Sequence, residues 1–193
     1  MESADNVIAL KHSTEGVKNA LGTVFQRNSL ISTFNEFSLF TSISGLSYNF
    51  RDCTKLKEIG LDNITKWERS DMAYSHFNSV IRYIYLPNWV APSGSKSYFF
   101  QYPPTGIRVG KNCTSIARMM LGGSCEYIIL EPSRVVARGT SSYSNASCYF
   151  VPDDYVNIYK SSSEWSSYSS RIYPISSFRE MFPNEPDRMY EPW

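Results

Sequence analysis

The amino-acid sequence predicts an α/β, β-rich repeat fold, in which parallel strands form one ladder and a C-terminal helical cap closes it. Short segments with apolar residues two positions apart recur at a nearly constant interval, which indicates stacked strands. Apolar residues at helical spacing follow the last copy. With 193 residues, of which 42% are hydrophobic and 19% charged, the chain can bury such a core without disulfide bonds.

Five segments carry the alternating apolar pairs that predict strands: Ile59/Leu61, Ile84/Leu86, Ile107/Val109, Ile128/Leu130 and Tyr149/Val151. The second members of these pairs lie at positions 61, 86, 109, 130 and 151, so the segments follow one another at a nearly even spacing. That spacing is typical of leucine-rich repeats, whose period is roughly 20–29 residues. Because one such strand cannot bury its face alone, the copies are expected to stack as a short solenoid. An ordinary β-sandwich with coincidentally spaced strands is the alternative.

Residues 1–28 precede the repeats, which are expected to occupy residues 29–152. Ser13 or Thr14 is placed to cap a short helix with one apolar side. That side consists of Val17, Leu21, Val24 and Phe25. Two interpretations of this helix stay open, namely a cap on the first repeat and an attachment or oligomerisation element.

Residues 153–175 are expected to form the cap, because the end of a solenoid exposes apolar core and strand edges. Asp153 or Asp154 is placed to N-cap a helix that begins near Tyr155. The apolar side of the cap is expected to consist of Val156, Tyr159, Trp165, Tyr168 and Ile172. A direct binding role for Trp165 is the alternative.

Residues 176–193 are expected to be extended, because three prolines disfavour both helix and strand. The segment is rich in large apolar residues: Phe178, Met181, Phe182, Met189, Tyr190 and Trp193. It either folds back on its own domain or serves as an arm that docks on a neighbouring subunit. Aromatic anchors in an extended segment favour the arm.

Two motifs resemble the BspA-like leucine-rich repeats, a family found in gut Bacteroides-type bacteria and their phages. The first is a Phe-x-x-Cys unit followed by L-x-x-I-x-L, carried by Phe50, Cys53, Leu56, Ile59 and Leu61. The second is the stretch 149–160 with Trp165, Tyr168 and 171–175, which is similar to the segment that often closes such arrays. The resemblance covers residues 30–178 and implies a leucine-rich-repeat solenoid.

Nothing in the sequence assembles a catalytic site, so we expect a protein that is not an enzyme and has no cofactor or metal. The four cysteines form no C-x-x-C pair, and buried single thiols are expected. No nucleophile or orienting acid is brought to His12 or His76 by sequence. An all-β hydrolase is the rival class. A formal charge of +1 and the lack of a long apolar run argue against nucleic acid and membrane insertion.

The candidate functional residues lie on a surface. Residues between the inward pairs point to the opposite side of the sheet, where stacking would gather an aromatic patch with one arginine. These partner-binding candidates are Tyr83, Tyr85, Arg108, Tyr127, Ile129 and Phe150, joined by Phe182, Tyr190 and Trp193 of the C-terminal arm. The alternative is that a terminal segment covers this face within the monomer.

The resemblance and the two candidate attachment ends favour a phage virion component: a head or tail decoration, fibre or connector subunit. Met-Glu-Ser-Ala-Asp at the N-terminus is not a basic n-region followed by an apolar h-region, so we expect no secretory signal, which a virion protein does not need. We expect a homo-oligomer in the virion that contacts other virion proteins or a host surface receptor. A cell-surface adhesin module of a gut bacterium is the alternative.

Overall fold

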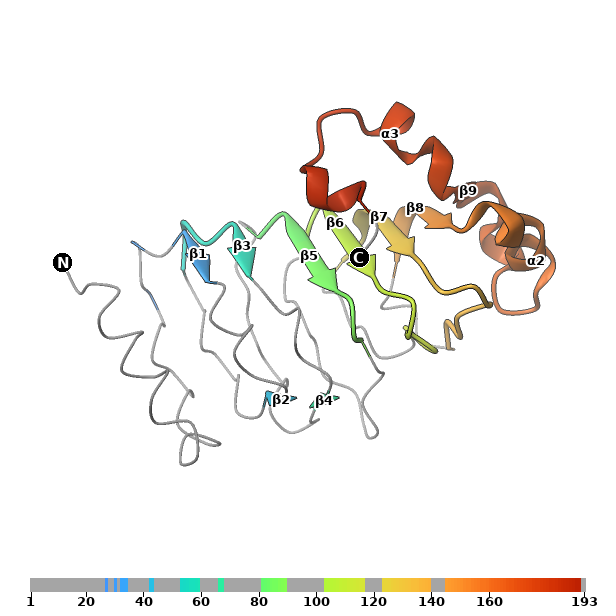
Figure 1. Cartoon of the computed structure of the whole chain (residues 1–193), viewed down its shortest axis with the longest axis horizontal. Helices are drawn as coiled ribbons and strands as arrows, with labels where there is room; N and C mark the ends of the chain where they lie inside the picture. The colour runs from blue at the N-terminus through green and yellow to red at the C-terminus, as the bar shows by residue number, and fades with distance from the viewer. Residues whose placement is uncertain are drawn as a thin grey trace.

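The computed structural model describes residues 27, 30, 32–34, 42–43, 53–59, 66–67, 81–89, 103–116, 123–139 and 145–191. Within these residues, seven strands form one sheet in which all neighbouring strands are parallel. In spatial order, which is also chain order, they are β1 (Thr33–Phe34), β3 (Glu58–Ile59), β5 (Tyr83–Leu86), β6 (Gly106–Val109), β7 (Cys125–Leu130), β8 (Ala146–Val151) and β9 (Ile172–Pro174), as Figure 1 shows. The fold is α/β, a parallel sheet with a few short helices, which confirms the predicted class.

Each step across the sheet advances the chain by a similar number of residues. Tyr83 pairs with Gly106, and Gly106 pairs with Tyr127. Earlier in the chain, Thr33 pairs with Glu58, and Glu58 pairs with Tyr83. Every one of these steps falls within a repeat period of roughly 20–29 residues. The strand register therefore agrees with the intervals predicted from the apolar pairs.

A similar interval recurs outside the large sheet. β2 (Ser42–Ile43) pairs in parallel with β4 (Lys66–Trp67), with Ser42 opposite Lys66. Figure 1 places these two strands well away from the large sheet. Later in the chain, Ser115 and Ala137 form a parallel bridge with nearly the same separation in sequence. The connections between strands thus also repeat at two places, which the sequence did not predict.

The main core lies on one face of the sheet. Every predicted inward pair of β5 to β8 is fully buried in it: Ile84/Leu86, Ile107/Val109, Ile128/Leu130 and Tyr149/Val151. Because the strands are in register, Ile84, Ile107 and Ile128 stack as one row. Burial of one aliphatic side chain of this size contributes about 1.5–3 kcal/mol to folding. The inward pairs in these strands are confirmed.

Short helices follow β8 and pack against the main core. They are the 3-10 helix η3 (Asp153–Tyr155), the helix α2 (Val156–Ser161) and the 3-10 helix η4 (Ser166–Arg171). Tyr159 and Trp165 are fully buried among the core residues, as expected for the apolar side of a cap. The indole Nε1 of Trp165 donates a hydrogen bond of 2.8 Å to the Val136 carbonyl, so this tryptophan is an internal packing residue.

Two predictions for this region are wrong. Neither Asp153 nor Asp154 caps α2, because both lie within η3, and α2 has no side-chain cap. Asp153 Oδ1 instead accepts the backbone N–H of Ser176 at 3.2 Å. Ile172 does not continue the helical stripe but begins β9, where it pairs with Tyr149 of β8. That step matches the others in length, so the strand repeat overrides the local helical pattern.

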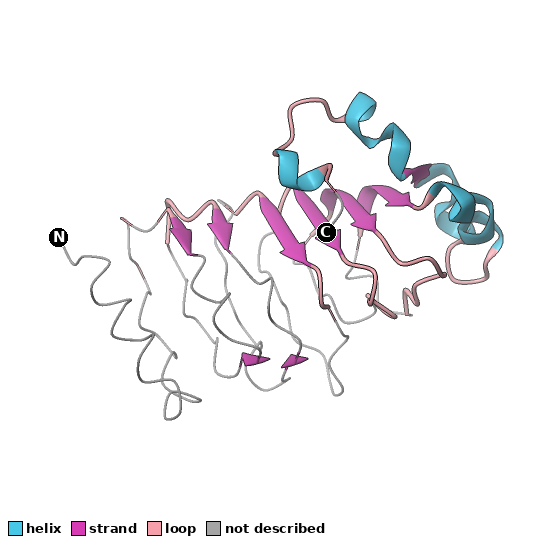
Figure 2. Ribbon diagram, in the orientation of Figure 1, coloured by secondary structure: helices cyan, strands magenta, loops and turns pink. Residues whose placement is uncertain are grey.

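The C-terminal segment, defined here as residues 175–191, is not the extended arm that was predicted. It consists of the 3-10 helix η5 (Ile175–Ser177), the helix α3 (Phe178–Met181) and the 3-10 helix η6 (Asp187–Met189). Pro174 and Pro186 stand immediately before η5 and η6, where a fixed φ suits the first turn of a helix. Figures 1 and 2 show the segment running back over the strands.

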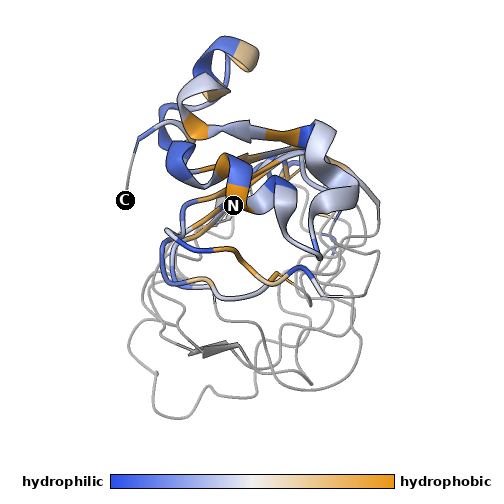
Figure 3. Cartoon of the chain, turned by 90° about the vertical axis from the view of Figure 1, so that its right-hand side faces the viewer, coloured by the Kyte–Doolittle hydropathy of each residue, from blue (hydrophilic) through white to orange (hydrophobic). Residues whose placement is uncertain are grey.

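Several predictions concern residues outside the described ones. They are the leader 1–28 apart from residue 27, the motif residues Phe50 and Leu61, the two histidines and Trp193. Leu56 and Cys53 of the first repeat motif are described, and both are buried in the main core. Figure 3 views the chain from its C-terminal elements, whose ribbon alternates between blue or pale hydrophilic to intermediate stretches and orange hydrophobic ones.

Candidate binding face

The sheet has a second face, opposite the main core, which we call the outer face. It is formed by six residues of β5 to β8: Tyr83, Tyr85, Arg108, Tyr127, Ile129 and Phe150. Tyr85 pairs with Arg108 and Arg108 with Ile129, so neighbouring strands place these side chains in one row. The structure thus brings together all six partner-binding candidates that the alternation of strand residues predicts.

Gly106 makes room for the ring of Tyr127 on the outer face. It lies between Tyr83 and Tyr127 in the register. A Cβ atom on residue 106 would lie 2.2 Å from two ring carbons of Tyr127. The glycine therefore allows the Tyr127 ring to lie over β6.

The outer face is covered by the C-terminal segment. Tyr127 and Phe150 have no exposed surface, and Arg108 is only 3% exposed. Phe178 and Met189 of the segment are buried in the same cluster. The expectation of an exposed aromatic patch is wrong for these strands, because the alternative holds and a terminal segment fills the face.

Aromatic rings of the outer face and of the segment pack against one another. The ring of Phe178 lies 4.8 Å from that of Tyr127 and 4.9 Å from that of Phe150, both edge-on. Phe182 lies 4.7 Å from Tyr127 and is stacked on Phe178. Edge-on aromatic pairs contribute about 0.5–1.5 kcal/mol each beyond the area they bury.

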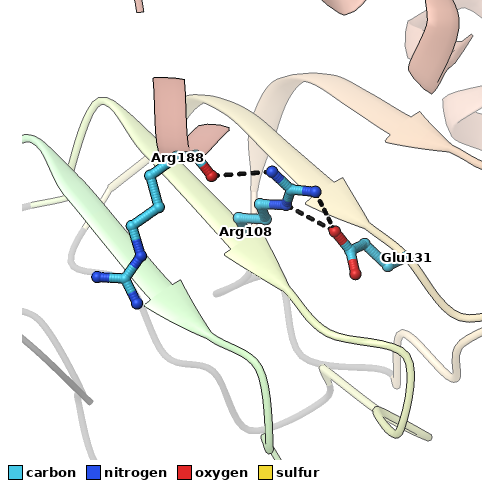
Figure 4. A network of polar contacts seen from close by, with 3 residues as sticks. All are labelled: Arg108, Glu131 and Arg188. Carbon is cyan, nitrogen blue, oxygen red and sulfur yellow. Dashed lines mark hydrogen bonds and ion pairs between the residues drawn. The ribbon is translucent and has the colours of Figure 1, made fainter. Parts of the chain in front are cut away.

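A buried ion pair joins Arg108 of the outer face to Glu131 (Figure 4). The Nε of Arg108 donates to Glu131 Oε1 at 2.7 Å, and its Nη2 donates to the same oxygen. The two side chains are 4% and 5% exposed. The third contact of Arg108 crosses to the segment, because Nη1 donates to the backbone carbonyl of Arg188 at 2.8 Å. Arg108 thus joins the sheet to η6 through one main-chain oxygen.

Glu131 is a residue that the sequence prediction missed. It follows β7 by one position and shares the outward parity of Tyr127 and Ile129. Its second oxygen, Oε2, has no hydrogen-bond partner among the described residues. Burial raises the pKa of the Glu131 carboxyl, and the opposing effect of Arg108 only partly offsets it. The carboxylate therefore occupies a site that is costly for a charge.

Glu185 is the second residue that the sequence prediction missed, and its carboxylate interacts with Tyr83 and Tyr127. The hydroxyl of Tyr127 donates to Glu185 Oε2 at 2.7 Å. Burial, together with the hydrogen bond and charge of Glu185, raises the pKa of Tyr83 to about 12. The same causes raise the pKa of Tyr127 further still. Both phenols are therefore held in their neutral, donating form.

Contacts within the C-terminal segment also stabilise its conformation. The hydroxyl of Tyr190 accepts the N–H of Glu185 at 2.8 Å and donates to the carbonyl of Phe182. The guanidinium of Arg179 lies 3.8 Å over the Tyr190 ring, and that of Arg188 lies 4.2 Å over Tyr85 of the face. Phe182 and Tyr190, predicted as anchors on a neighbouring subunit, thus pack within this chain.

The described part of the chain holds no cluster of three metal-ligating side chains, and its four cysteines form no disulfide. Burial raises the pKa of Cys113 and of Cys125 to about 12, which keeps both thiols neutral. Cys148 is half-buried beside the outer-face cluster. Among the described residues, no helix has the length and apolar character needed to cross a bilayer.

A shallow hollow lies elsewhere, lined by Thr114, Val135, Ala137, Ser162, Ser163 and Glu164. Its one carboxylate is already engaged, because Glu164 Oε2 accepts the N–H groups of Arg138 and Gly139 at 2.6 and 3.2 Å. The outer face with its bound segment is therefore the better candidate for a functional surface. Comparison with family models, curated proteins and solved structures finds no match to this chain.

Proposed function

We propose that this chain is a short leucine-rich-repeat-like solenoid of the BspA-like kind, and that it is a structural or interaction protein and not an enzyme. The observation that carries the proposal is the strand register, in which successive parallel strands are separated by a nearly constant length of chain. That length lies within the period of leucine-rich repeats, roughly 20–29 residues. Such arrays present long surfaces built of repeated units and act through contacts with other macromolecules.

The second supporting observation is the repeat in the connections between strands. The β2–β4 pair and the Ser115–Ala137 bridge join residues whose separation in sequence is close to that of the sheet strands. A β-sandwich, the alternative fold, has antiparallel strands and does not require this regularity. A solenoid requires it, because each coil has the same path as the one before.

Within this class, we propose a virion component of a phage: a head or tail decoration, fibre or connector subunit that forms homo-oligomers and contacts other virion proteins or a host receptor. The aromatic outer face is occupied by a segment of the chain itself. An adhesin of the alternative kind, on a bacterial surface, is expected to leave such a face free for its ligand. The covered face favours a subunit whose main contacts are those of assembly.

Fractionation of the organism that carries the gene tests this proposal. An antibody against the full chain is expected to detect it in density-purified virus particles. Detection only on intact cells, by surface biotinylation and protease shaving, would support the adhesin and contradict the virion component. Absence from both particles and the cell surface would contradict the virion component and the adhesin alike.

A further inference from the structure

We propose that the outer face is a docking site for the C-terminal segment of a second copy of this chain, so that copies associate by exchanging residues 178–190. This inference rests on the proposed assembly function and names its partner. The chain's own segment fills the site in the structure, and the same contacts are available to an identical segment from another copy.

The segment is a layer of its own. Among the described residues, the main-core cluster contains none beyond Ile172, whereas the outer-face cluster joins the sheet only to residues of the segment. Lifting the segment would uncover Tyr127 and Phe150 but would leave the inward pairs of the strands packed. Exchange therefore does not require global unfolding.

The outer face and the C-terminal segment each contribute specific hydrogen-bonding groups to the contact between them. The face contributes the hydroxyl of Tyr127 and the guanidinium of Arg108. The segment contributes the carboxylate of Glu185 and the carbonyl of Arg188, whose side chain also covers a tyrosine ring. Each copy carries both halves of this interface. Two copies can therefore satisfy one another reciprocally and close a symmetric dimer.

The connection between the two layers is short. β9 ends at Pro174 and stays paired with β8, while α3 begins at Phe178. Only η5 (Ile175–Ser177) lies between them, and a few residues of this kind can absorb the change of direction that exchange needs. A short connection also gives the chain's own segment a high effective concentration, on the order of millimolar. Exchange is therefore best measured in variants that weaken the contact between a chain's C-terminal segment and its own outer face.

A charge-swapped pair of full-length variants isolates the exchanged contact. Tyr83→Asp sets a carboxylate against Glu185 within its own chain, and Glu185→Lys removes the carboxylate that the two tyrosines hold. In a mixture, the altered face of the first variant meets the altered segment of the second with opposite charges. The unaltered face and the unaltered segment also meet. Each variant alone is expected to be a monomer, and the equimolar mixture a one-to-one dimer by light scattering and native mass spectrometry.

The native thiol Cys148 reports on the same event, because it lies half-buried beside the outer-face cluster. Its alkylation is expected to be at least tenfold faster in either variant than in the wild type, and to slow again in the mixture. The buried thiols Cys113 and Cys125 serve as the folding control, since they should stay protected throughout. Glu180→Lys, the same charge change at an exposed position of the segment, is the matched control for Glu185→Lys and should not complement Tyr83→Asp.

A synthetic peptide of residues 175–191 provides a second test that does not depend on folding of Tyr83→Asp. Full-length Glu185→Lys is expected to bind this wild-type peptide at least about tenfold more tightly than the wild-type protein does, because its own segment competes less well. A mixture that stays monomeric, together with equal peptide binding by both proteins, overturns the proposal. That result leaves the particle assay unaffected, so the two proposals fail separately.

Discussion

Breaking the buried ion pair between Arg108 and Glu131 is expected to destabilise the protein strongly. Glu131→Met leaves a guanidinium that is 4% exposed without its carboxylate, and Arg108→Met leaves a carboxylate that is 5% exposed. Removing one member of such a pair costs about 3–5 kcal/mol, because the remaining charge stays desolvated. Arg108→Met also loses the hydrogen bond to the Arg188 carbonyl, which adds about 1 kcal/mol.

The double variant separates this effect from simple loss of contacts. With both charges replaced by methionine, no buried charge is left at this site. The free energy of unfolding is therefore expected to return to within about 1–2 kcal/mol of the wild-type value. Urea denaturation of the four proteins gives the coupling energy of the pair. In the single variants the protein can also relieve the buried charge by lifting the segment, which faster alkylation of Cys148 would reveal.

A small loss of stability in both single variants would contradict a buried ion pair. An ion pair that is in fact solvated contributes about 0–1 kcal/mol. If both single variants lose less than that and Cys148 stays protected, the pair is not buried beneath the segment. The same outcome would remove the role of Arg108 as the link between β6 and η6.

Three further results are expected. Raising the pH from the ordinary tyrosine pKa of 10.0 through about 12 should remove the stability that neutral Tyr83 provides, seen as phenolate absorbance rising together with loss of structure; Tyr83→Phe should shift this transition. Gly106→Ala, whose new Cβ meets the Tyr127 ring at 2.2 Å, should cost about 1–3 kcal/mol in urea denaturation and speed alkylation of Cys148. Trp165→Ala should cost about 3–5 kcal/mol by the same method, because it empties a fully buried site of the main core.

The strand ladder could be predicted because it rests on two simple regularities. Alternation identifies the inward side chains, and a constant interval requires them to stack. The same interval would have found β9, because Val151 pairs with Pro174, which lies one such interval further along the chain. The serine-rich stretch before β9 has apolar residues at helical spacing, and this local pattern concealed the next strand at the same interval. The interval between strands predicts this region better than the local helical pattern, since β9 pairs with β8.

The residues of the outer face could be predicted, but it was harder to predict that the C-terminal segment of the same chain covers them. Strand parity assigns Tyr85, Tyr127 and Phe150 to one side of the sheet, as the structure confirms. Composition shows only that the C-terminal segment needs a surface for its aromatic residues. Whether that surface belongs to the same chain depends on the direction in which the chain leaves β9. The short helix η5 sets this direction, and no periodic pattern in the sequence encodes it.

The sequence position of Arg108 nevertheless indicates that the outer face is covered. An arginine in the middle of an apolar row needs no fixed partner when the row faces water, because solvent satisfies its charge. Under a cover it needs a carboxylate of the same parity on a neighbouring strand, since a buried unpaired charge is costly. Glu131 has that parity and lies just beyond β7. The combination of an arginine and a diagonal carboxylate on an otherwise aromatic face therefore indicates a face that is built to be covered, and the backbone carbonyl of Arg188 is what completes it.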